Sequence, residues 1–576
     1  MKQRIRIPSK SKTARIFPPA PTFAALVNNM KEHGGKTAFM WNAREGEEKD
    51  GAINYETFAE EIEIAVTALT EEGLAGKRVA FIGNPSVTYA AFLVAVMASG
   101  GAVIPLDRER PTEDIALLLS RAGAELLFYG SGVKADVEAL CREEGLSLVC
   151  AMETALPLPD HPKARRYADL LFTGASVLSA GKQVAFPTLD PASPAALIYT
   201  SGTLKTRKCA ALSAANLLAG VNAVCGAVEL EKADVVLSVL PFHHSYELAS
   251  LLVLLNYGVT VVLNDSPASF YDNMKKYRPT GLFLVPSILS AIYARLWDSN
   301  KQMKHARGLH YGIKASNILL SIGIDLRKKL FSNTRSFFGG QLVKIVSGGA
   351  PLTPALISSF ESLGVSVYDG YGLTECGPFV SLTPYFARRV GSVGKPLPSV
   401  TVRIDAEETS EEYGYPVGEI EVKGESVMLG YDGDPEATAD AFTLDGYFRT
   451  GDLGYLDEDG YLYVTGRKKT VIVLDNGRNV APEELEEYLN ATEEIDDALV
   501  FAARDEGGVL RLYASVYPNP ELTVSNDTDE VLARVKARVA EINHRLPLFK
   551  QIASVTLADA PHPRSATGKL YRNGHA

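Results

Sequence analysis

The first two thirds of the chain alternate short apolar runs with longer stretches in which apolar residues recur at helical spacing. The earliest of these predict a helix over residues 58–69, a strand over 78–82, a helix over 89–98 and a strand over 102–106. Strands of the same kind are predicted over 235–240, 259–263, 281–285, 342–347 and 365–368. Short apolar strands that alternate with helices are typical of parallel sheets covered on both faces. We therefore expect an α/β fold, with a large N-terminal domain of stacked mixed or parallel sheets flanked by helices.

After about residue 391 the pattern changes to short apolar segments separated by Gly, Asp and Pro. Segments 400–404, 418–422 and 460–464 predict an antiparallel sheet or barrel. A further compact block, with helices expected over 482–490 and 530–543, follows residue 467. We expect the N-terminal domain to span residues 1–468, with its β-rich subdomain at about 391–466, and a small α+β C-terminal domain to span 469–576.

The composition narrows the class of protein. A net charge of −11 argues against nucleic-acid binding. The strongest apolar run, residues 248–255, is much shorter than the roughly 20 residues of a membrane span, so no transmembrane segment is expected. Five cysteines without Cys-x-x-Cys spacing indicate reduced thiols in a cytoplasmic protein. The Lys and Arg residues between positions 2 and 15 form a basic N-terminal arm, which leaves peripheral membrane contact open.

A hydroxyl-rich loop follows the apolar strand expected at 195–199. It reads TSGTLKTRK over residues 200–208 and ends in cations. The hydroxyls can donate hydrogen bonds to anionic oxygens, Gly202 lets the backbone approach closely, and the cations offset negative charge. The hydroxyls are those of Thr200, Ser201 and Thr203, and the last cation is Lys208. The loop is therefore a candidate phosphate site, although a polar surface turn after a buried strand has the same composition.

The spacing of this loop excludes two common nucleotide-binding loops. A Walker loop counted from Gly202 requires a glycine at Arg207 and a metal-binding hydroxyl at Cys209. No Gly-x-Gly-x-x-Gly sequence follows an expected strand, so a Rossmann dinucleotide site has no support. The loop belongs to neither class.

Several further motifs contain residue types that bind nucleotides or acids, and all but the first also contain glycine. They are PFHHSYE at 241–247, SGGAPL at 347–352, VYDGYGLTE at 367–375, FRTGDLGY at 448–455, GRKK at 466–469 and PRSATGKLYR at 563–572. In the third motif, Tyr371 offers an aromatic face for a base, and Thr374 and Glu375 offer a hydroxyl and a carboxylate for a hydrated hard cation. The adjacent His243 and His244 should point in different directions from an extended backbone, so a shared metal site is not expected.

Taken together, these motifs resemble those of the adenylate-forming superfamily, which contains acyl-CoA synthetases, the adenylation domains of peptide synthetases and beetle luciferases. The resemblance runs from Tyr55 to Arg572, with the motifs in family order. The phosphate loop departs from the family's usual YTSGTTGxPKG. The departures are Leu204 and Lys205 for the Thr-Gly step, Arg207 for proline and Cys209 for the last glycine. Because glycine adopts positive φ without strain, we expect its loss to reshape or strain the loop.

The resemblance assigns a role to each candidate site residue. Nucleotide binding is assigned to Thr200, Ser201, Gly202, Thr203, Gly349, Ala350, Asp369, Gly370, Tyr371, Asp452 and Arg467. Within this set, Tyr371 is expected to stack on adenine and Asp452 to hold both ribose hydroxyls. The expected catalytic residues are Lys569, Lys208, Thr374 and Glu375, with Thr374 on the α-phosphate and Glu375 as the Mg²⁺ ligand. The resemblance also implies that His244 and Gly377 line the acyl pocket, that Lys469 is the hinge and that Gly477 lies at the thiol channel.

The activity that the resemblance implies is that of a ligase. ATP and Mg²⁺ convert a carboxylic acid into an acyl-adenylate, after which a thiol displaces AMP and the mobile C-terminal domain rotates about the hinge between the two halves. The motifs look most like those of long-chain fatty acyl-CoA synthetases, so the expected substrates are a medium- or long-chain fatty acid and coenzyme A. Loading of an acyl carrier protein through its phosphopantetheine, a luciferase-like oxygenase and a nucleotide-binding relative with weakened catalysis stay open as alternatives.

Overall fold

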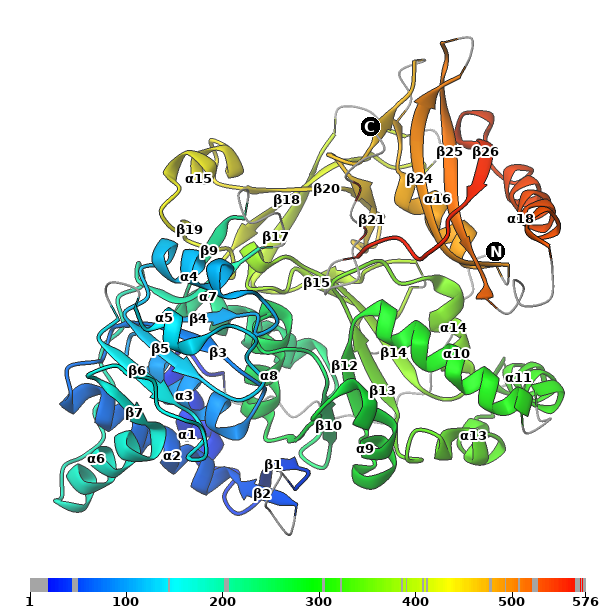
Figure 1. Ribbon diagram of the computed structural model, residues 1–576. Helices are drawn as coiled ribbons and strands as arrows, with labels where there is room; N and C mark the ends of the chain where they lie inside the picture. The colour runs from blue at the N-terminus through cyan, green and yellow to red at the C-terminus, as the bar shows by residue number, and fades with distance from the viewer. Residues whose placement is uncertain are drawn as a thin grey trace.

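The structure of the chain is a computed structural model (Figure 1). It describes residues 19–43, 50–142, 146–200, 207–302, 306–321, 324–384, 387–389, 391–406, 409–410, 413–475, 479–492, 494–505, 508–520, 527–564, 570 and 572. The basic N-terminal arm lies outside the described residues. The chain forms two large sheets whose strands are interleaved in sequence, then a β-rich subdomain and a C-terminal block.

The first large sheet has the strand order β19-β9-β8-β4-β3-β5-β6-β7. Its strands are β3 (Arg78–Ile82), β4 (Ala102–Leu106), β5 (Leu126–Tyr129), β6 (Leu148–Ala151), β7 (Ala164–Arg166), β8 (Pro194–Tyr199), β9 (Cys209–Ser213) and β19 (Gly430–Tyr431). The pairs from β8 to β7 are parallel, whereas β9 is antiparallel to both β8 and β19. The helices α2 (Tyr55–Glu71), α3 (Val87–Ala98), α4 (Thr112–Arg121), α5 (Val137–Leu140) and α6 (Tyr167–Ser179) connect this part of the chain.

The second large sheet has the order β16-β15-β14-β13-β12-β10-β11-β1-β2 and is parallel from β14 to β1. Its strands are β1 (Thr37–Trp41), β2 (Gly51–Asn54), β10 (Val235–Ser238), β11 (Thr260–Leu263), β12 (Gly281–Leu284), β13 (Lys344–Ser347), β14 (Ser366–Tyr371), β15 (Ser381–Leu382) and β16 (Lys395–Pro396). Its helices are α1 (Phe23–Lys31), α7 (Ala214–Ala227), α8 (Ser245–Tyr257), α9 (Phe270–Tyr277), α10 (Pro286–Gln302), α11 (Ala306–Ser321), α12 (Arg327–Leu330), α13 (Ser332–Ser336) and α14 (Pro354–Ser362), with the 3₁₀ turns η1 (Pro267–Ser269) and η2 (Thr374–Cys376).

The main core lies between the two large sheets. Alternate residues of a strand point to opposite faces of its sheet. Phe81 of β3 and Val261 of β11 pack in the core shared by the two sheets. Their neighbours Ala80 and Val262 pack in separate hydrophobic cores on the other face of each sheet. The helices α3 and α8 are buried along nearly their whole length, and both contribute to the shared core. A helix that is apolar all round is stable only where it is covered on all sides, which explains why α3 carries almost no polar residues.

The β-rich subdomain is an antiparallel sheet of order β17-β18-β20-β21. Its elements are β17 (Val400–Asp405), β18 (Gly418–Gly424), α15 (Pro435–Ala441), β20 (Phe448–Leu456) and β21 (Leu462–Arg467). The predicted segment 460–464 begins two residues too early, because Asp457 to Gly460 form the turn that joins the last two strands. The change of pattern after residue 391 therefore corresponds to a change from a parallel to an antiparallel sheet.

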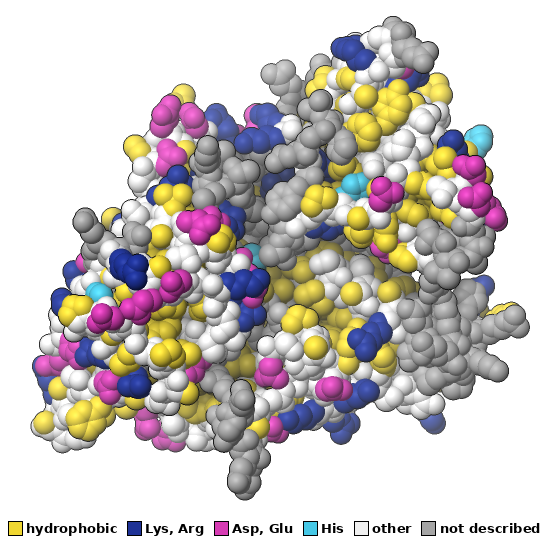
Figure 2. Space-filling model, viewed as in Figure 1, with side chains coloured by type: hydrophobic (Ala, Val, Ile, Leu, Met, Phe, Trp, Pro, Cys, Tyr) yellow, Lys and Arg dark blue, Asp and Glu magenta, His cyan; other side chains and the backbone are white. Residues whose placement is uncertain are grey.

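The C-terminal block packs two helices against one face of a three-stranded sheet. Its elements are β22 (Ile472–Val473), β23 (Asn479–Val480), α16 (Pro482–Asn490), β24 (Ile495–Arg504), β25 (Leu510–Pro518), α18 (Thr528–Asn543), η3 (Leu548–Lys550) and β26 (Ile552–Leu557). The block lies beside β21 and above α14 (Figure 1). Figure 2 shows a recess between it and the large domain, with hydrophobic side chains in the recess and Lys and Arg side chains along one border. Within the described part of the chain, no helix combines the length and apolar character needed to cross a membrane.

Candidate active site

The phosphate loop is closed at its base by its own two ends. Tyr199 at the end of β8 pairs with Cys209 at the start of β9. The Thr200 amide and hydroxyl both donate to the carbonyl oxygen of Lys208, at 2.9 and 3.2 Å. These two bonds bring Thr200 and Lys208, the first and last residues of the loop, together. Ser201, Gly202 and Thr203 lie outside the described residues.

Tyr431 connects the phosphate loop to the candidate metal ligand. It lies on β19, which pairs with β9 directly after the loop. Its hydroxyl donates to Oε1 of Glu375 at 3.1 Å, while Nζ of Lys208 lies 4.5 Å from the centre of its ring. Burial, and then the neighbouring Glu375, raise the pKa of Tyr431 above its ordinary value, so the hydroxyl stays a donor. Sequence reasoning missed Tyr431, because only the pairing of distant strands places it between the two charges.

Thr374 and Glu375 lie in η2, a short turn that follows the β14 strand. The Thr374 hydroxyl is 2.9 Å from the hydroxyl of Ser245, the first residue of α8. The carbonyl oxygen of Glu375 accepts a hydrogen bond from the Met428 amide at 2.8 Å. The turn η2 is therefore held by Ser245 of α8 on one side and by Met428, shortly before Tyr431, on the other.

A second cluster joins Tyr371, Asp452 and Arg467. The Tyr371 hydroxyl donates to Oδ2 of Asp452 at 2.8 Å, and Nε of Arg467 is 2.7 Å from the other carboxylate oxygen. Asp452 and Arg467 face one another across the pair of strands β20 and β21. Asp452 is buried at 4% exposure, and a buried carboxylate requires such partners. Burial raises the pKa of Tyr371, and the Asp452 charge raises it further.

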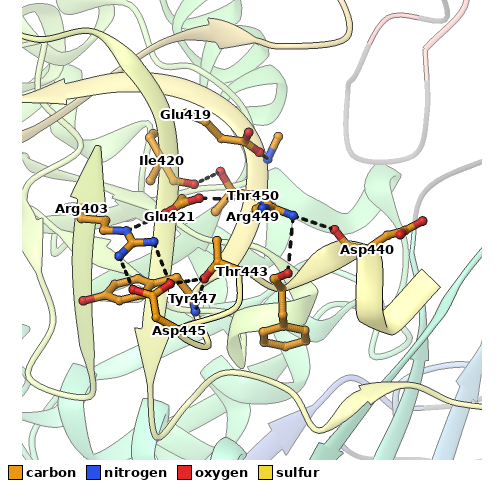
Figure 3. Close-up of polar contacts among 12 residues, drawn as sticks. Arg403, Glu419, Ile420, Glu421, Asp440, Thr443, Asp445, Tyr447, Arg449 and Thr450 are labelled. Carbon is orange, nitrogen blue, oxygen red and sulfur yellow. Dashed lines mark hydrogen bonds and ion pairs between the residues drawn. The ribbon is translucent and has the colours of Figure 1, made fainter. Parts of the chain in front are cut away.

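The strand that carries Asp452 is held by its neighbours in the subdomain (Figure 3). Thr450 donates through its hydroxyl to the Ile420 carbonyl at 2.7 Å, and the same hydroxyl accepts from the Asp452 amide at 3.1 Å. The Gly451 amide donates to Glu419 at 3.0 Å. A side-chain network of Arg403, Glu421 and Asp445 joins β17, β18 and the loop before β20. The contacts of Thr450 and Gly451 hold the strand on either side of Asp452, and so they fix the position of the Asp452 carboxylate.

The glycine-rich ends of β13 and β14 lie next to each other. Ser347 pairs with Asp369, so Gly349 and Ala350 follow at the same edge as Gly370. Gly349 has a φ of +87°, which favours glycine. Asp369 is buried, which raises its pKa well above the ordinary value, while the Gly370 amide acts in the opposite direction. This edge presents backbone in place of bulky side chains, which suits a flat ring.

The two histidines lie side by side, so the expectation that they point in different directions is wrong. The His244 amide donates to the Pro241 carbonyl at 3.1 Å, and this tight turn brings the ring centres of His243 and His244 within 4.3 Å. Burial lowers the pKa of His243 to about 3 and also lowers that of His244, with Arg207 adding to the effect on His244. Both rings are neutral near neutral pH. Among the described residues, no group of three or more His, Cys, Asp or Glu is arranged to hold a metal ion.

His244 and Gly377 occupy different environments. His244 is the residue before α8, and its buried Nε2 has no hydrogen-bond partner within the described part of the chain. Gly377 ends η2 with a φ of +72°, and a β-carbon there would lie 2.8 Å from the Ser426 carbonyl oxygen. Gly377 is therefore required by close backbone packing. The acyl-pocket role of both residues stays a prediction.

The junction between the large domain and the C-terminal block is a turn at residues 468–470. Lys469 is exposed in this turn, and the amides of Thr470 and Val471 donate back to the Arg467 carbonyl at 3.1 and 2.9 Å. A short distance on, Ala481 packs against Gly466. Gly477 and Lys569 lie outside the described residues. The hinge, thiol-channel and lysine roles therefore stay predictions.

A further contact between the two parts involves Lys550. Its ammonium group is 2.8 Å from Glu484 of α16 and 5.7 Å from the ring centre of Tyr413 in the β-rich subdomain. Lys550 is 2% exposed, so the contact is enclosed. Together with Ala481 against Gly466, it holds α16 toward β21, next to the cluster of Asp452 and Arg467.

Comparison with known proteins agrees with this arrangement. Residues 26–432 match the family described as AMP-binding enzyme, and residues 469–575 match the AMP-binding enzyme C-terminal domain. The chain is 31% identical to the long-chain-fatty-acid–CoA ligase FadD15 of Mycobacterium bovis over 77% of this chain and 74% of the relative. It is 31% identical to the sulfoacetate–CoA ligase of Cupriavidus necator over 69% of each chain. The crystal structure of ATP-bound MatB from Rhodopseudomonas palustris superposes with a TM-score of 0.71 at 25% identity, covering 95% of this chain and 97% of that one.

Proposed function

The chain belongs to the AMP-binding enzyme family, as an AMP-forming acid–CoA ligase, and we propose that its substrate is a medium- or long-chain fatty acid. One observation carries the assignment of the site. The site consists of two polar clusters, which η2 and β14 connect. In the first, Tyr431 contacts both Lys208 and Glu375. In the second, Asp452 contacts both Tyr371 and Arg467. The first suits phosphate and metal, and the second suits a nucleoside.

The nucleoside end of the proposed site is built from Tyr371, Asp452 and Arg467. Asp452 is an acceptor-only carboxylate, so it can accept from both ribose hydroxyls while its other partners hold it in place. The aromatic ring of Tyr371 offers a stacking face for adenine. The edge at Gly349, Ala350 and Gly370 carries little side-chain bulk, so a flat ring could approach the backbone there.

The phosphate end is built from Thr374, Glu375 and Lys208. A carboxylate and a hydroxyl are hard oxygen donors of the kind that Mg²⁺ accepts together with phosphate and water, so these residues fit that ion. When bound, Mg²⁺ offsets the negative charge of the phosphates. Tyr431 holds the Glu375 carboxylate and the Lys208 ammonium group at a fixed separation, so the positive charge is in place before the nucleotide binds.

The proposed reaction has two steps. A carboxylate oxygen of the acid attacks the α-phosphorus of ATP, the bond to the bridging oxygen breaks, and pyrophosphate leaves. The coenzyme A sulfur then attacks the acyl carbonyl carbon, and AMP leaves with the oxygen that formed the mixed anhydride. Lys208 and Lys569 stabilise the negative charge that develops in the first step.

The C-terminal block is proposed to serve both steps in different poses. In the structure its helix α16 faces β21, close to Asp452 and Arg467. In the pose that serves the first step, Lys569 would be supplied to the phosphate. Rotation about Lys469 would then bring the segment at Gly477 to the thiol channel.

Coenzyme A is the proposed acceptor, because the relatives reported above are CoA ligases. The fatty acid is supported by the first of these relatives, whereas the second acts on sulfoacetate by its name. The two clusters of catalytic side chains speak against a relative that has lost catalysis.

The test is a panel of carboxylic acids offered with Mg·ATP and coenzyme A, with acyl-CoA measured by mass spectrometry. The panel includes fatty acids of increasing length, aromatic acids and sulfoacetate. We expect the highest kcat/KM with medium or long fatty acids. A clear preference for another class would overturn the substrate assignment, and product formed only with a holo acyl carrier protein in place of coenzyme A would overturn the acceptor.

A further inference from the structure

Three side chains of the C-terminal block, those of Asp497, His562 and Ser515, are joined in a row by hydrogen bonds. Nδ1 of His562 is 2.8 Å from Oδ2 of Asp497, and the His562 amide donates to the same oxygen at 2.7 Å. Nε2 of His562 is 3.0 Å from the hydroxyl of Ser515. The side chains of His562 and Asp497 are 8% and 7% exposed. Both polar atoms of the imidazole ring are therefore engaged.

These contacts fasten residues 558–562, called the crossing segment, onto the three-stranded sheet of the block. Leu512, Ala514 and Val516 of β25 face the helices, so Ser515 faces the opposite side. After the edge strand β26, the Ala558 amide donates to the Val516 carbonyl at 2.8 Å. The chain then passes over β25 and reaches β24, where His562 contacts Asp497. His562 thus joins the crossing segment to two strands at once.

The segment that His562 fastens leads directly to Lys569. Arg564 forms an ion pair with the second oxygen of Asp497 and makes an antiparallel bridge with Leu570. On the far side, Arg572 donates to both oxygens of Glu486 at 2.9 and 2.7 Å. Residues 565–569 are outside the described part of the chain, but both of their flanks are anchored on described residues.

We propose that His562 is a positioning residue for the adenylation step, holding the start of the segment that presents Lys569 to the nucleotide. The proposal rests on the proposed role of Lys569 in that step. His562 contacts neither nucleotide nor acid in this account. It acts by removing freedom from the chain between β26 and the lysine, so that less ordering is needed when the lysine reaches the phosphate.

His562→Ala separates positioning from general stability. Removing the ring leaves Asp497 with the backbone amide of residue 562 and with Arg564, and it breaks the contact of this segment with Ser515. We expect kcat for acyl-adenylate formation to fall roughly 10-fold to 100-fold, since a misplacement of about 1 Å can cost 10²-fold. The KM values for ATP and acid, and thioester formation from supplied acyl-adenylate, should not change. A variant whose C-terminal block is merely destabilised would lose both half-reactions together.

Two conservative variants identify which contact matters. The side-chain amide of asparagine in His562→Asn can reproduce the Nδ1 contact with Asp497, whereas His562→Gln reaches toward Ser515. We expect His562→Asn to recover most of the adenylation rate, because it keeps the contact with Asp497, and the Asp497 carboxylate also holds Arg564. The control is His544→Ala, which removes an exposed histidine at the end of α18 in the same block.

The outcomes distinguish this inference from the function on which it rests. Lys569→Ala, measured in parallel, should abolish most of the adenylation rate. If Lys569→Ala is impaired but His562→Ala equals the His544→Ala control, the positioning role is wrong. If Lys569→Ala adenylates normally, the lysine assignment in the proposed function is wrong, and the positioning role falls with it. An equal loss in both half-reactions for His562→Ala would assign the ring to stability alone.

Discussion

The Tyr431 hydroxyl donates a hydrogen bond of 3.1 Å to the Glu375 carboxylate, across 56 residues of sequence. The same ring lies under the Lys208 ammonium group. A candidate metal ligand and a candidate phosphate ligand are therefore kept apart and oriented by one side chain that contacts both. This relationship makes Tyr431 the most informative residue to change in the site.

Tyr431→Phe removes the hydroxyl and keeps the ring. A hydrogen bond to a charged group contributes about 1.5–3 kcal/mol, so we expect adenylation to slow by roughly 10-fold or more. The Mg²⁺ concentration needed for half-maximal pyrophosphate release should rise, because Glu375 is less fixed. Tyr431→Leu should be worse, since it also removes the ring beneath Lys208. Equal rates for the phenylalanine and wild-type proteins would show that the hydroxyl does not position Glu375.

The altered phosphate loop should make ATP binding sensitive to salt. Lys205 and Arg207 add positive charge where the family has glycine and proline, and flexible charges are screened by salt more than a backbone amide nest. We expect isothermal titration to show ATP affinity falling steeply with ionic strength. The double change Leu204→Thr with Lys205→Gly should reduce that slope and tighten binding or speed adenylation. Lys163→Ala, at an exposed lysine elsewhere, is the control for charge alone. Loss of ATP binding in the double variant would identify the loop as a specialised alternative.

Glu247 should make stability depend on pH. It lies in the first turn of α8, 4% exposed, with Ser238 as hydrogen-bond donor, and burial raises its pKa to about 7. The folded protein therefore binds a proton that the unfolded chain releases near pH 4.5, so the contribution of Glu247 to the free energy of unfolding falls as pH rises from there through about 7.

Glu247→Gln removes this dependence. Near pH 8 the variant should be more stable than the wild type by up to about 3 kcal/mol, and near pH 4 the two should be alike. Urea unfolding at both pH values measures the difference. Glu60→Gln, at an exposed position of α2, should show no such change. Equal stability of the two proteins at pH 8 would contradict the assignment.

Lys469→Pro tests the hinge. Proline fixes φ, so a residue that must change conformation between two domain poses cannot do so. We expect one half-reaction to survive and the other to fail when adenylation and thioester formation are assayed separately. Unchanged kinetics in both would place the hinge at another residue.

The strands were the most predictable feature of the fold. The predicted bounds of β3 and β4 agree with the structure because the apolar runs there are bounded by glycine or charged residues. The helix expected over 58–69 is longer, Tyr55–Glu71, because Asn54 caps it through a hydrogen bond to the Thr57 amide. Local patterning identifies a buried segment, whereas a cap depends on the geometry of one side chain.

The site was less predictable than the fold, for a physical reason. Residues within one motif, such as Thr374 and Glu375, can be proposed from their spacing. The contact of Tyr371 with Asp452 joins residues 81 apart, and Tyr431 reaches its position only because β19 pairs with β9. The rings of His243 and His244 are brought together by a tight turn that an extended-backbone argument could not foresee. The pairing of strands that are distant in sequence determines which side chains meet in the site, and a local sequence pattern does not specify that pairing.

The most direct test of the proposed chemistry follows the oxygen atoms of the acid. A fatty acid labelled with ¹⁸O in both carboxylate oxygens is incubated with the enzyme, Mg·ATP and coenzyme A, and the products are analysed by mass spectrometry. If an acyl-adenylate is formed and then attacked by the thiol, one labelled oxygen must appear in AMP and the other must stay in the acyl-CoA. Unlabelled AMP, or label in inorganic phosphate together with ADP, would contradict the account.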